Sequence, residues 1–170
     1  MMDRLIFFTR HFLIPFEKYN EIYPGLWLGN LKSCYDAEFL KEKNIKAIVS
    51  LYTPLLESKK FTKKGISIFQ LNITDNIGLK SNILLFEQFD SINAFIKKNL
   101  KSGAVLVHCH YGWQRSASVC TGFLMNHLKI SKDQAINIIQ SRRRFALFPE
   151  SSFDLALRLY ARKLELRNYK

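Results

Sequence analysis

One short segment of the sequence combines a candidate nucleophile with an anion-binding side chain. Cys109 follows the apolar run 104–107 and is separated by five residues from Arg115 and Ser116. A loop that joins the carboxyl end of a strand to a helix N-terminus can turn successive backbone N–H groups inward, which creates an anion-binding nest. Arg115 is suited to close this nest because its planar guanidinium matches two phosphate oxygens. Gly112 is expected to adopt the positive φ that so tight a loop requires.

The same loop is expected to prepare Cys109 for nucleophilic attack. A free cysteine thiol has a pKa of about 8.5, and a helix N-terminus with a nearby arginine lowers it to roughly 3.5–7.5. The thiolate then dominates at neutral pH and can attack a phosphoester. Ser116 is placed to donate a hydrogen bond to the sulfur, which helps the thiolate to leave again. The nest and its rim are expected to come from His110, Tyr111, Gly112, Trp113 and Gln114.

The elements that position this loop follow from the spacing of the apolar residues. Short apolar runs predict strands at 26–29, 47–51, 66–71 and 104–107. Helical spacing predicts helices at 33–44, from 81 to about 102, at 117–127, from 131 to about 142, and through 155–166. Strands that alternate with helices indicate an α/β fold, and the length of 170 residues suits a single domain.

Local features refine the helix predictions. Ser81 is expected to cap the long helix, and Ser131 with Gln134 matches a capping box. The three arginines at 142–144 come near the end of a helix, where cations complement the dipole, so a solvated basic helix end is expected. Binding of an acidic substrate is the alternative. Residues 3–13 predict a short helix that covers the core of the domain, and the alternatives are a homodimer arm or contact with a membrane surface.

The composition limits the classes of partner. The chain carries 26 Lys and Arg against 14 Asp and Glu, a net charge of +12. The net charge rises along the chain, from +1 over residues 1–50 and +4 over 51–103 to +7 over 104–170. Such an excess points to an anionic partner such as a phosphoester or nucleic acid, or to surface charge that serves solubility. No apolar run approaches the roughly 18 residues that a membrane-spanning helix needs, so no integral membrane association is expected.

The segment VLVHCHYGWQRSAS resembles the His-Cys-x5-Arg-Ser signature of cysteine-dependent protein phosphatases, specifically of the small, atypical dual-specificity branch. The resemblance extends from about Ile22 to about Leu164 and includes YPGLWLG at 23–29 and LNITDN at 71–76. It implies the cysteine-phosphatase fold, with a mostly parallel or mixed sheet of about five strands flanked by helices in a single domain. It also implies an N-terminal extension over residues 1–20 and a catalytic domain over 21–170.

The resemblance further implies the roles of the site residues. Cys109 forms a phosphocysteine intermediate, and Arg115 binds the phosphate. Asp75, in the loop before the long helix, protonates the leaving oxygen and then activates water as a carboxylate. His108 supports the loop by bonding to nearby backbone, and the reaction uses neither metal nor cofactor. From the residues alone, Asp75 has a second interpretation, as a carboxylate in a turn.

The loop departs from the family pattern at two places. The family often has Ala-Gly where this chain has Tyr111-Gly112, and Ser where it has Gln114. Backbone N–H groups make the nest, so these changes are expected to alter the rim and the choice of substrate and to leave the chemistry intact.

Three functions are weighed for these residues. The first is a phosphatase that hydrolyses phosphotyrosine, phosphoserine and phosphothreonine in proteins. The second is an RNA 5′-triphosphatase on the same fold, favoured by the charge of +7 beyond residue 103 and by stacking on Trp113. The third is a phosphate-binding module with little catalysis. Asp75 argues against the second function, because a phosphate leaving group has little need of an acid, and the intact catalytic set argues against the third.

The remaining cysteines and the N-terminus complete the sequence-based expectations. Cys34 and Cys120 are expected to be packing thiols. A metal site is disfavoured because the available His and Cys residues lack the close pairings of zinc ligands. The N-terminus has no signal-peptide core, so a cytoplasmic location with access to the nucleus is expected. The many Lys, Ile and Asn residues suit an AT-rich genome such as that of a large DNA virus, for which the location is host cytoplasm or virion.

Overall fold

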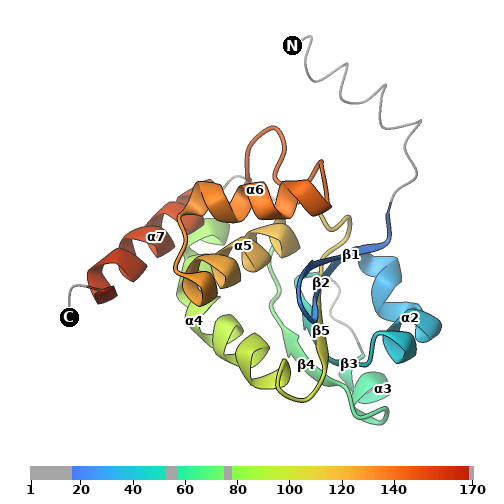
Figure 1. Ribbon diagram of the computed structural model, residues 1–170. Coiled ribbons are helices and arrows are strands. Elements are labelled where there is room, and N and C mark those ends of the chain that lie inside the picture. Colours follow the sequence, from blue (N-terminus) through green and yellow to red (C-terminus); the bar gives the residue numbers. More distant parts are fainter. Residues whose placement is uncertain (1–16, 53–56, 75–77, 169–170) are drawn as a thin grey trace.

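The computed structural model describes residues 17–52, 57–74 and 78–168. The helix expected over residues 3–13 and the candidate acid Asp75 lie outside the described residues. A five-stranded mixed sheet lies at the centre, in the order β1-β2-β5-β3-β4, and helices cover both of its faces (Figure 1). This architecture confirms the predicted α/β fold.

Four of the five strands run parallel. The strands are Tyr19–Tyr23 (β1), Leu26–Gly29 (β2), Ile45–Ser50 (β3), Ser67–Gln70 (β4) and Ala104–His108 (β5). β2, β5, β3 and β4 are mutually parallel, whereas β1 is antiparallel to β2. The carboxyl ends of the parallel strands therefore meet at one edge of the sheet, where open α/β sheets usually bind their ligands. Cys109 follows β5 at this edge.

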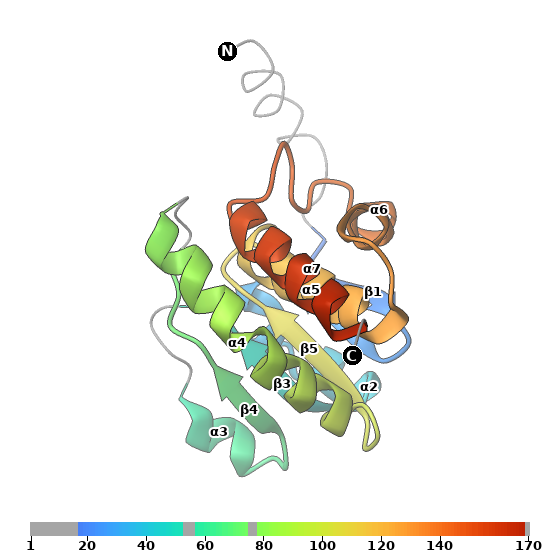
Figure 2. The ribbon, with the colours of Figure 1, turned by 90° about the vertical axis from the view of Figure 1, so that its left-hand side faces the viewer.

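The helices divide between the two faces of the sheet. One face is covered by α4 (Leu79–Asn99), α5 (Arg115–Leu128), α6 (Lys132–Arg142) and α7 (Asp154–Asn168). The other face carries the short helices η1 (Leu31–Tyr35), α2 (Ala37–Glu42) and α3 (Ser58–Thr62). Figure 2 looks onto the first face and shows α4, α5 and α7 in front of the strands. Within the described residues, no helix has both the length and the apolar composition needed to cross a membrane.

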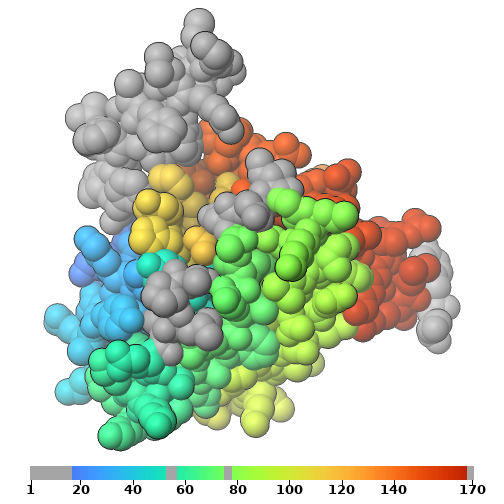
Figure 3. Space-filling model, turned by 180° about the vertical axis from the view of Figure 1, so that it is seen from behind, coloured from blue at the N-terminus to red at the C-terminus, as the bar shows by residue number. Residues whose placement is uncertain are grey.

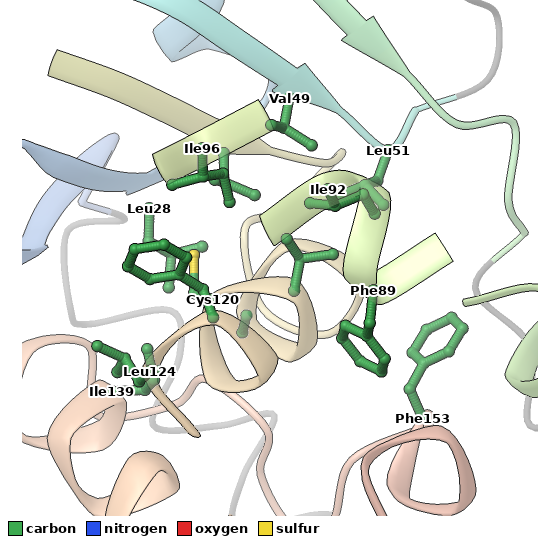
Figure 4. Packing of buried hydrophobic residues seen from close by; sticks show 14 of the residues in the cluster. Leu28, Val49, Leu51, Phe89, Ile92, Ile96, Cys120, Leu124, Ile139 and Phe153 are labelled. Atoms are coloured by element: carbon green, nitrogen blue, oxygen red, sulfur yellow. The ribbon is translucent and has the colours of Figure 1, made fainter. Parts of the chain in front are cut away.

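β5 is buried along its whole length, and its side chains alternate between two hydrophobic cores. Val105 and Val107 face the larger core under the four long helices, whereas Leu106 packs into the smaller core under η1, α2 and α3. In the larger core, Val49 of the sheet lies near Ile96 of α4 (Figure 4). Burial on both faces explains why the run 104–107 is apolar without alternation.

β1 and α3 were not predicted from the sequence, and the single helix expected over residues 33–44 is divided into η1 and α2. β1 was not predicted because Ile22 is its only fully buried residue, which leaves no visible alternation. α3 is a five-residue helix with Phe61 as its one buried side chain. The helix expected over 33–44 is interrupted at Asp36, whose carboxylate accepts the Phe39 N–H at 3.1 Å and starts α2. Asp36 therefore closes η1 with its backbone N–H, which donates to the Ser33 carbonyl, and begins α2 with its side chain.

The expected N-cap at Ser81 is wrong. α4 begins at Leu79 after Gly78, and Ser81 lies buried in the first turn. Its hydroxyl lies 3.2 Å from the Thr74 hydroxyl, so it meets the preceding loop. The capping box at the start of α6 is confirmed, with both of its hydrogen bonds formed.

Candidate active site

The loop after β5 is fixed on a frame of strand ends and leads directly into α5. The Leu51 N–H, just after β3, donates to the His108 carbonyl at 2.9 Å. The Leu71 N–H, just after β4, donates to the Ser50 carbonyl at 2.9 Å. Three neighbouring strands therefore end in register, and loop 109–114 starts from a fixed point.

Cys109 lies at the base of this loop and is almost fully buried. Two donors point at its sulfur: the Gly112 N–H and the Ser116 hydroxyl each lie 3.2 Å from Sγ. Both donors favour the thiolate, because a charged acceptor forms stronger hydrogen bonds than a neutral one. α5 begins at Arg115, so the positive end of its dipole faces the same loop.

Gly112 has the conformation that the sequence predicted for it. Its φ is +73°, in the region that favours glycine. A β-carbon at this position would lie 2.6 Å from the Gly29 carbonyl oxygen of β2. Both the backbone angle and the close approach to β2 therefore require glycine here.

Neighbouring segments bind the carbonyl groups at the two ends of the loop. The Leu31 N–H of η1 donates to the His110 carbonyl at 3.0 Å. The Leu147 N–H, after α6, donates to the Trp113 carbonyl at 2.9 Å. Both carbonyls are thereby held on the outer side of the loop.

Arg143 binds the two carbonyls in between. Its Nε donates to the Gly112 carbonyl at 2.9 Å, and its Nη2 donates to the Tyr111 carbonyl at 3.1 Å. Its Nη1 donates to Asn20 Oδ1 of β1 at 2.7 Å. Arg143 is only 4% exposed, so the prediction of a solvated helix end is wrong for this residue. Arg142 and Arg144 are exposed, as expected.

The outward carbonyls determine the direction of the loop N–H groups. Among the described residues, only Phe148–Pro149 is a cis peptide, so the peptides of the loop are trans. In a trans peptide the N–H points away from the carbonyl of the same unit. With the carbonyls of residues 110–113 bound from outside, the N–H groups of residues 111–114 turn into the loop, as an anion nest requires.

His108 is buried behind Cys109 and is neutral at physiological pH. Burial lowers the pKa of its imidazole to about 4. Its Nδ1 lies 3.4 Å from the Cys109 carbonyl and donates to it, because a carbonyl can only accept. This contact with backbone is the kind expected for His108 from the sequence.

Arg115 is buried at the start of α5, beside the carboxyl ends of two other strands. Its Nη1 donates to the Leu51 carbonyl at 3.2 Å and to the Ile73 carbonyl at 3.4 Å. These carbonyls orient the guanidinium at the mouth of the nest. Asp75 follows Ile73 by two residues in the sequence but lies outside the described residues.

Aromatic side chains form a row along the rim of the loop. Tyr52 stacks on His110 at 5.3 Å between ring centroids, and His110 meets the edge of Tyr111 at 4.3 Å. Tyr111 and Trp113 lie 5.9 Å apart. In Figure 3 the yellow surface of the segment around this loop is visible beside the blue N-terminal segments. The rim is therefore aromatic and solvent-accessible, with Tyr111 55% exposed.

The Gln114 side chain points away from the nest toward the segment before α7. Its Nε2 lies 3.3 Å from the Glu150 carbonyl, and its Oε1 accepts the Ser152 N–H at 2.9 Å. The sequence placed Gln114 at the rim. In the structure its side chain ties the loop to residues 148–152.

The other two cysteines are buried free thiols. The Cys34 Sγ donates to the Leu31 carbonyl at 3.0 Å, and burial raises the pKa of this thiol to about 12. Burial also raises the pKa of the Cys120 thiol. Of the residues that the structure describes, no three His, Cys, Asp or Glu gather as a metal site would require.

Comparison with known proteins gives a family match over most of the chain. The family described as "Dual specificity phosphatase, catalytic domain" matches residues 26–163. Among curated proteins, "MAP kinase phosphatase with leucine-rich repeats protein 3" of Dictyostelium discoideum is 30% identical over 88% of this chain, which spans 17% of that protein. "Putative tyrosine-protein phosphatase AMV078" of Amsacta moorei entomopoxvirus is 32% identical, over 83% of this chain and 82% of that protein.

A solved structure supports the same assignment. A mouse protein described as a "putative dual specificity phosphatase complexed with zinc tungstate" superimposes with a TM-score of 0.76 and 25% identity. The match covers 89% of this chain and 91% of the mouse chain. The match over residues 26–163 shows that the chain belongs to the dual-specificity phosphatase family, as its Cys109 loop indicated.

Proposed function

We propose that this chain hydrolyses phosphotyrosine, phosphoserine and phosphothreonine in proteins through a phosphocysteine intermediate on Cys109. In the first step the sulfur attacks phosphorus, the bond to the leaving oxygen breaks, and Asp75 protonates that oxygen. In the second step water attacks the phosphocysteine, Asp75 accepts a proton from the water, and phosphate leaves. The thiolate is then regenerated.

One observation carries this proposal: the donors aimed at the sulfur and the phosphate nest are built from the same loop. The Gly112 N–H and the Ser116 hydroxyl each lie 3.2 Å from the Cys109 sulfur. A phosphate bound in the nest would meet the neighbouring N–H groups of the loop and the Arg115 guanidinium. A phosphoester bound in this nest therefore brings its phosphorus to the nucleophile, and proximity of this kind lowers the barrier strongly.

Ser116 has a distinct role in the second step. Its hydrogen bond to the sulfur stabilises the thiolate that must leave when water attacks. Arg115 binds the equatorial oxygens and stabilises the charge that they carry in the transition state. Both residues are the ones that the sequence motif selected.

The assignment of Asp75 is supported by its neighbour in the chain. The Ile73 carbonyl accepts a hydrogen bond from Arg115 Nη1 at 3.4 Å. Asp75 follows Ile73 by two residues, so the candidate acid is joined to the residue that contacts the phosphate-binding arginine. A general acid positioned at the leaving oxygen typically contributes about 10²–10⁴-fold to the rate.

Phosphoproteins are the proposed substrate class. The two curated relatives named above are described as a MAP kinase phosphatase and a tyrosine-protein phosphatase, and both names refer to protein substrates. The exposed aromatic rim provides a surface on which a peptide side chain can pack beside the phosphate. The proposed substrates are proteins that carry phosphotyrosine, phosphoserine or phosphothreonine.

Rapid acid quench with a ³²P-labelled phosphopeptide tests the proposal. We expect label covalently bound to the wild-type protein and none bound to Cys109→Ser. Turnover without labelled protein, or labelling that persists in Cys109→Ser, would refute the phosphocysteine mechanism. Release of the γ-phosphate from triphosphorylated RNA serves as the comparison activity and should be slower than phosphopeptide hydrolysis.

A leaving-group series tests Asp75 separately. Asp75→Asn should slow hydrolysis of an alkyl phosphate by about 10²–10⁴-fold, and that of an activated aryl phosphate by far less. The aryl oxygen leaves readily without a proton, whereas the alkyl oxygen does not. Equal losses for the two substrates would remove Asp75 from its assigned role.

A further inference from the structure

Arg143 is a buried arginine beside the nest that the proposed reaction does not use. It lies immediately after α6, 28 positions beyond Arg115, and is 4% exposed. The three side-chain hydrogen bonds of Arg143 described above go to uncharged acceptors: the Gly112 carbonyl, the Tyr111 carbonyl and Asn20 Oδ1. Two further arginines precede and follow it directly, yet both are exposed. Its burial therefore reflects these specific contacts, not the general basicity of the segment.

The first consequence is geometric. The Tyr111 carbonyl and the Gly112 N–H belong to one trans peptide, so they point in opposite directions. Arg143 Nη2 holds the carbonyl at 3.1 Å on the outside, and the N–H then reaches the Cys109 sulfur at 3.2 Å on the inside. Nε holds the Gly112 carbonyl at 2.9 Å in the same way, which directs the next N–H inward. One guanidinium thus orients two consecutive peptides of the nest.

The second consequence is electrostatic. Among the described residues, no carboxylate forms an ion pair with Arg143. Burying a charge is costly when its nearest opposite charge, here Glu17, forms no ion pair with it, so an anion that arrives at the nest gains a favourable interaction. Burial lowers the pKa of the Arg143 guanidinium, whereas the charges of Glu17 and of Cys109 raise it. Arg143 therefore places a buried positive charge beside the loop that contains Cys109.

We infer that Arg143 is a positioning residue for oxyanion binding: it orients the 111–113 peptides with its planar fork and adds a second buried positive charge behind the nest. The inference rests on the proposed function in one respect, namely that loop 109–115 is the phosphate site. Arg115 closes the nest from the front, and Arg143 supports it from behind through the backbone. The chemical group that it serves is a tetrahedral oxyanion, either phosphate or the phosphoryl group of a substrate.

The main experiment measures binding of tungstate by calorimetry to the full chain and to matched variants. Arg143→Met keeps the apolar stem and removes both the fork and the charge, and we expect its Kd to rise by about 10- to 100-fold. Arg143→Lys keeps the charge and loses the fork, so its Kd should rise by only about 3- to 10-fold. Arg142→Met and Arg144→Met lower the net charge equally, and their Kd should change by less than about 2-fold.

Alkylation of Cys109 supplies a second readout, because the preference for anionic iodoacetate over neutral iodoacetamide should fall only in the Arg143 variants.

A second variant separates charge from architecture and does not remove Arg143. Asn20 Nδ2 donates to Glu17 Oε2, so Asn20→Asp is made in a Glu17→Gln background, which keeps the net charge and lets the amide at 17 donate to the new carboxylate. The carboxylate at position 20 keeps the shape of the Arg143 partner, pairs with the guanidinium and neutralises it. We expect the Kd for tungstate to rise by about 3- to 10-fold, with a Tm within a few degrees of wild type. A purely structural role for Arg143 predicts unchanged or tighter binding instead, since the tie to β1 becomes stronger.

The outcomes distinguish this inference from the proposed function. Wild-type protein that binds no tungstate contradicts the proposed phosphate site itself. Wild-type binding that Arg143→Met and Asn20→Asp leave unchanged overturns only the role of Arg143. Equal losses in the Arg142, Arg143 and Arg144 variants also overturn it, because net charge alone then explains the effect. If Arg143→Met does not fold, Asn20→Asp decides the matter, and wild-type affinity in that variant overturns the inference.

Discussion

The loop that contains Cys109 and the short helix that contains Cys34 bury the same chemical group in opposite ways. Both side chains are almost fully buried, and both sulfurs lie within hydrogen-bonding distance of backbone. Around Cys109 the partners are donors, the Gly112 N–H and the Ser116 hydroxyl. At Cys34 the partner is an acceptor, the Leu31 carbonyl, so the sulfur must keep its proton. Burial raises the pKa of the Cys34 thiol to about 12.

The contrast teaches that burial alone does not make a cysteine inert. What matters is whether the surrounding peptides present N–H groups or carbonyls to the sulfur. The Cys109 loop presents N–H groups because its carbonyls are occupied by Leu31, Leu147 and Arg143. In the 3-10 helix around Cys34, the carbonyl three residues earlier faces the sulfur. Cys120, in the core of Figure 4, is a third case, since it is packed among apolar side chains.

Replacing each cysteine with serine in turn should break the comparison most clearly. Cys109→Ser should lower kcat/KM for an aryl phosphate by at least about 10⁴-fold, because a hydroxyl is not ionised at neutral pH. Cys34→Ser and Cys120→Ser should lower stability but change kcat/KM by less than about 3-fold. The measurement is steady-state hydrolysis together with a urea denaturation curve for each variant. Retained turnover in Cys109→Ser would show that the Cys109 loop and the helix that contains Cys34 do not differ in the reactivity of their cysteines.

Replacing Gly112 should have the next largest effect on activity, and Gly65 supplies the control. Gly112→Ala introduces a β-carbon 2.6 Å from the Gly29 carbonyl at a φ of +73°, so the peptide that donates to Cys109 must shift. We expect kcat/KM to fall by about 10²–10³-fold, in line with the loss of preorganised donors. Gly65→Ala is the matched control, because Gly65 has a φ of +71° but nothing within 4 Å of its would-be β-carbon. That variant should lose only about 1 kcal/mol of stability and keep its activity. Equal activity losses in the two variants would contradict the role of the close contact.

Ser116→Ala sharpens the comparison by removing one of the two donors at Cys109. We expect a fall in kcat of about 10- to 100-fold with little change in tungstate affinity, because a hydrogen bond to a charged group contributes about 1.5–3 kcal/mol. Breakdown of the phosphocysteine should become the slow step, so acid quench should trap more labelled protein than in wild type. Ser118→Ala is a control on the same helix, since its hydroxyl meets Ser151 and not the sulfur. A drop in kcat without accumulation of the intermediate would assign Ser116 to the first step instead.

The smallest expected effect on activity concerns His108, the residue before Cys109. Its titration makes the stability of the folded protein depend on pH. The pKa of its imidazole is lowered to about 4 in the folded protein, against about 6.5 in the unfolded chain. As the pH falls below 6.5, the unfolded chain therefore binds a proton that the folded protein does not, and stability decreases until about pH 4. Over this window we expect a loss of about 3 kcal/mol, visible in urea denaturation between pH 7 and pH 4.5.

His108→Asn provides the comparison for that measurement. The amide can still donate to the Cys109 carbonyl, so kcat/KM at pH 7 should fall by less than about 10-fold. The part of the acid destabilisation due to His108 should disappear in this variant. The same slope of stability against pH in both proteins would show that His108 is not the titrating group.

Much of the fold was predictable because its signals are local. The apolar run 104–107 predicts a buried strand, and the Ser131–Gln134 pair predicts the start of α6, since each depends on neighbours in the sequence. The structure confirms both. β1 was not predictable in the same way, because its strand character depends on pairing with β2 and only Ile22 is fully buried. The incorrect cap at Ser81 has a similar origin, since its hydroxyl meets Thr74 from the preceding loop.

The sequence by itself determined the type of fold and the proposal of Cys109 as nucleophile and Arg115 as phosphate-binding residue. These follow from the order Cys109, five residues, Arg115 and Ser116 after an apolar run, which depends only on spacing along the chain. Only the tertiary structure decided which of three consecutive arginines is buried. Arg143 meets the Tyr111 and Gly112 carbonyls across more than 30 positions of sequence, and long-range packing of this kind leaves no periodic signal. The direction of the loop peptides, and with it the chemical difference between Cys109 and Cys34, is set by such contacts.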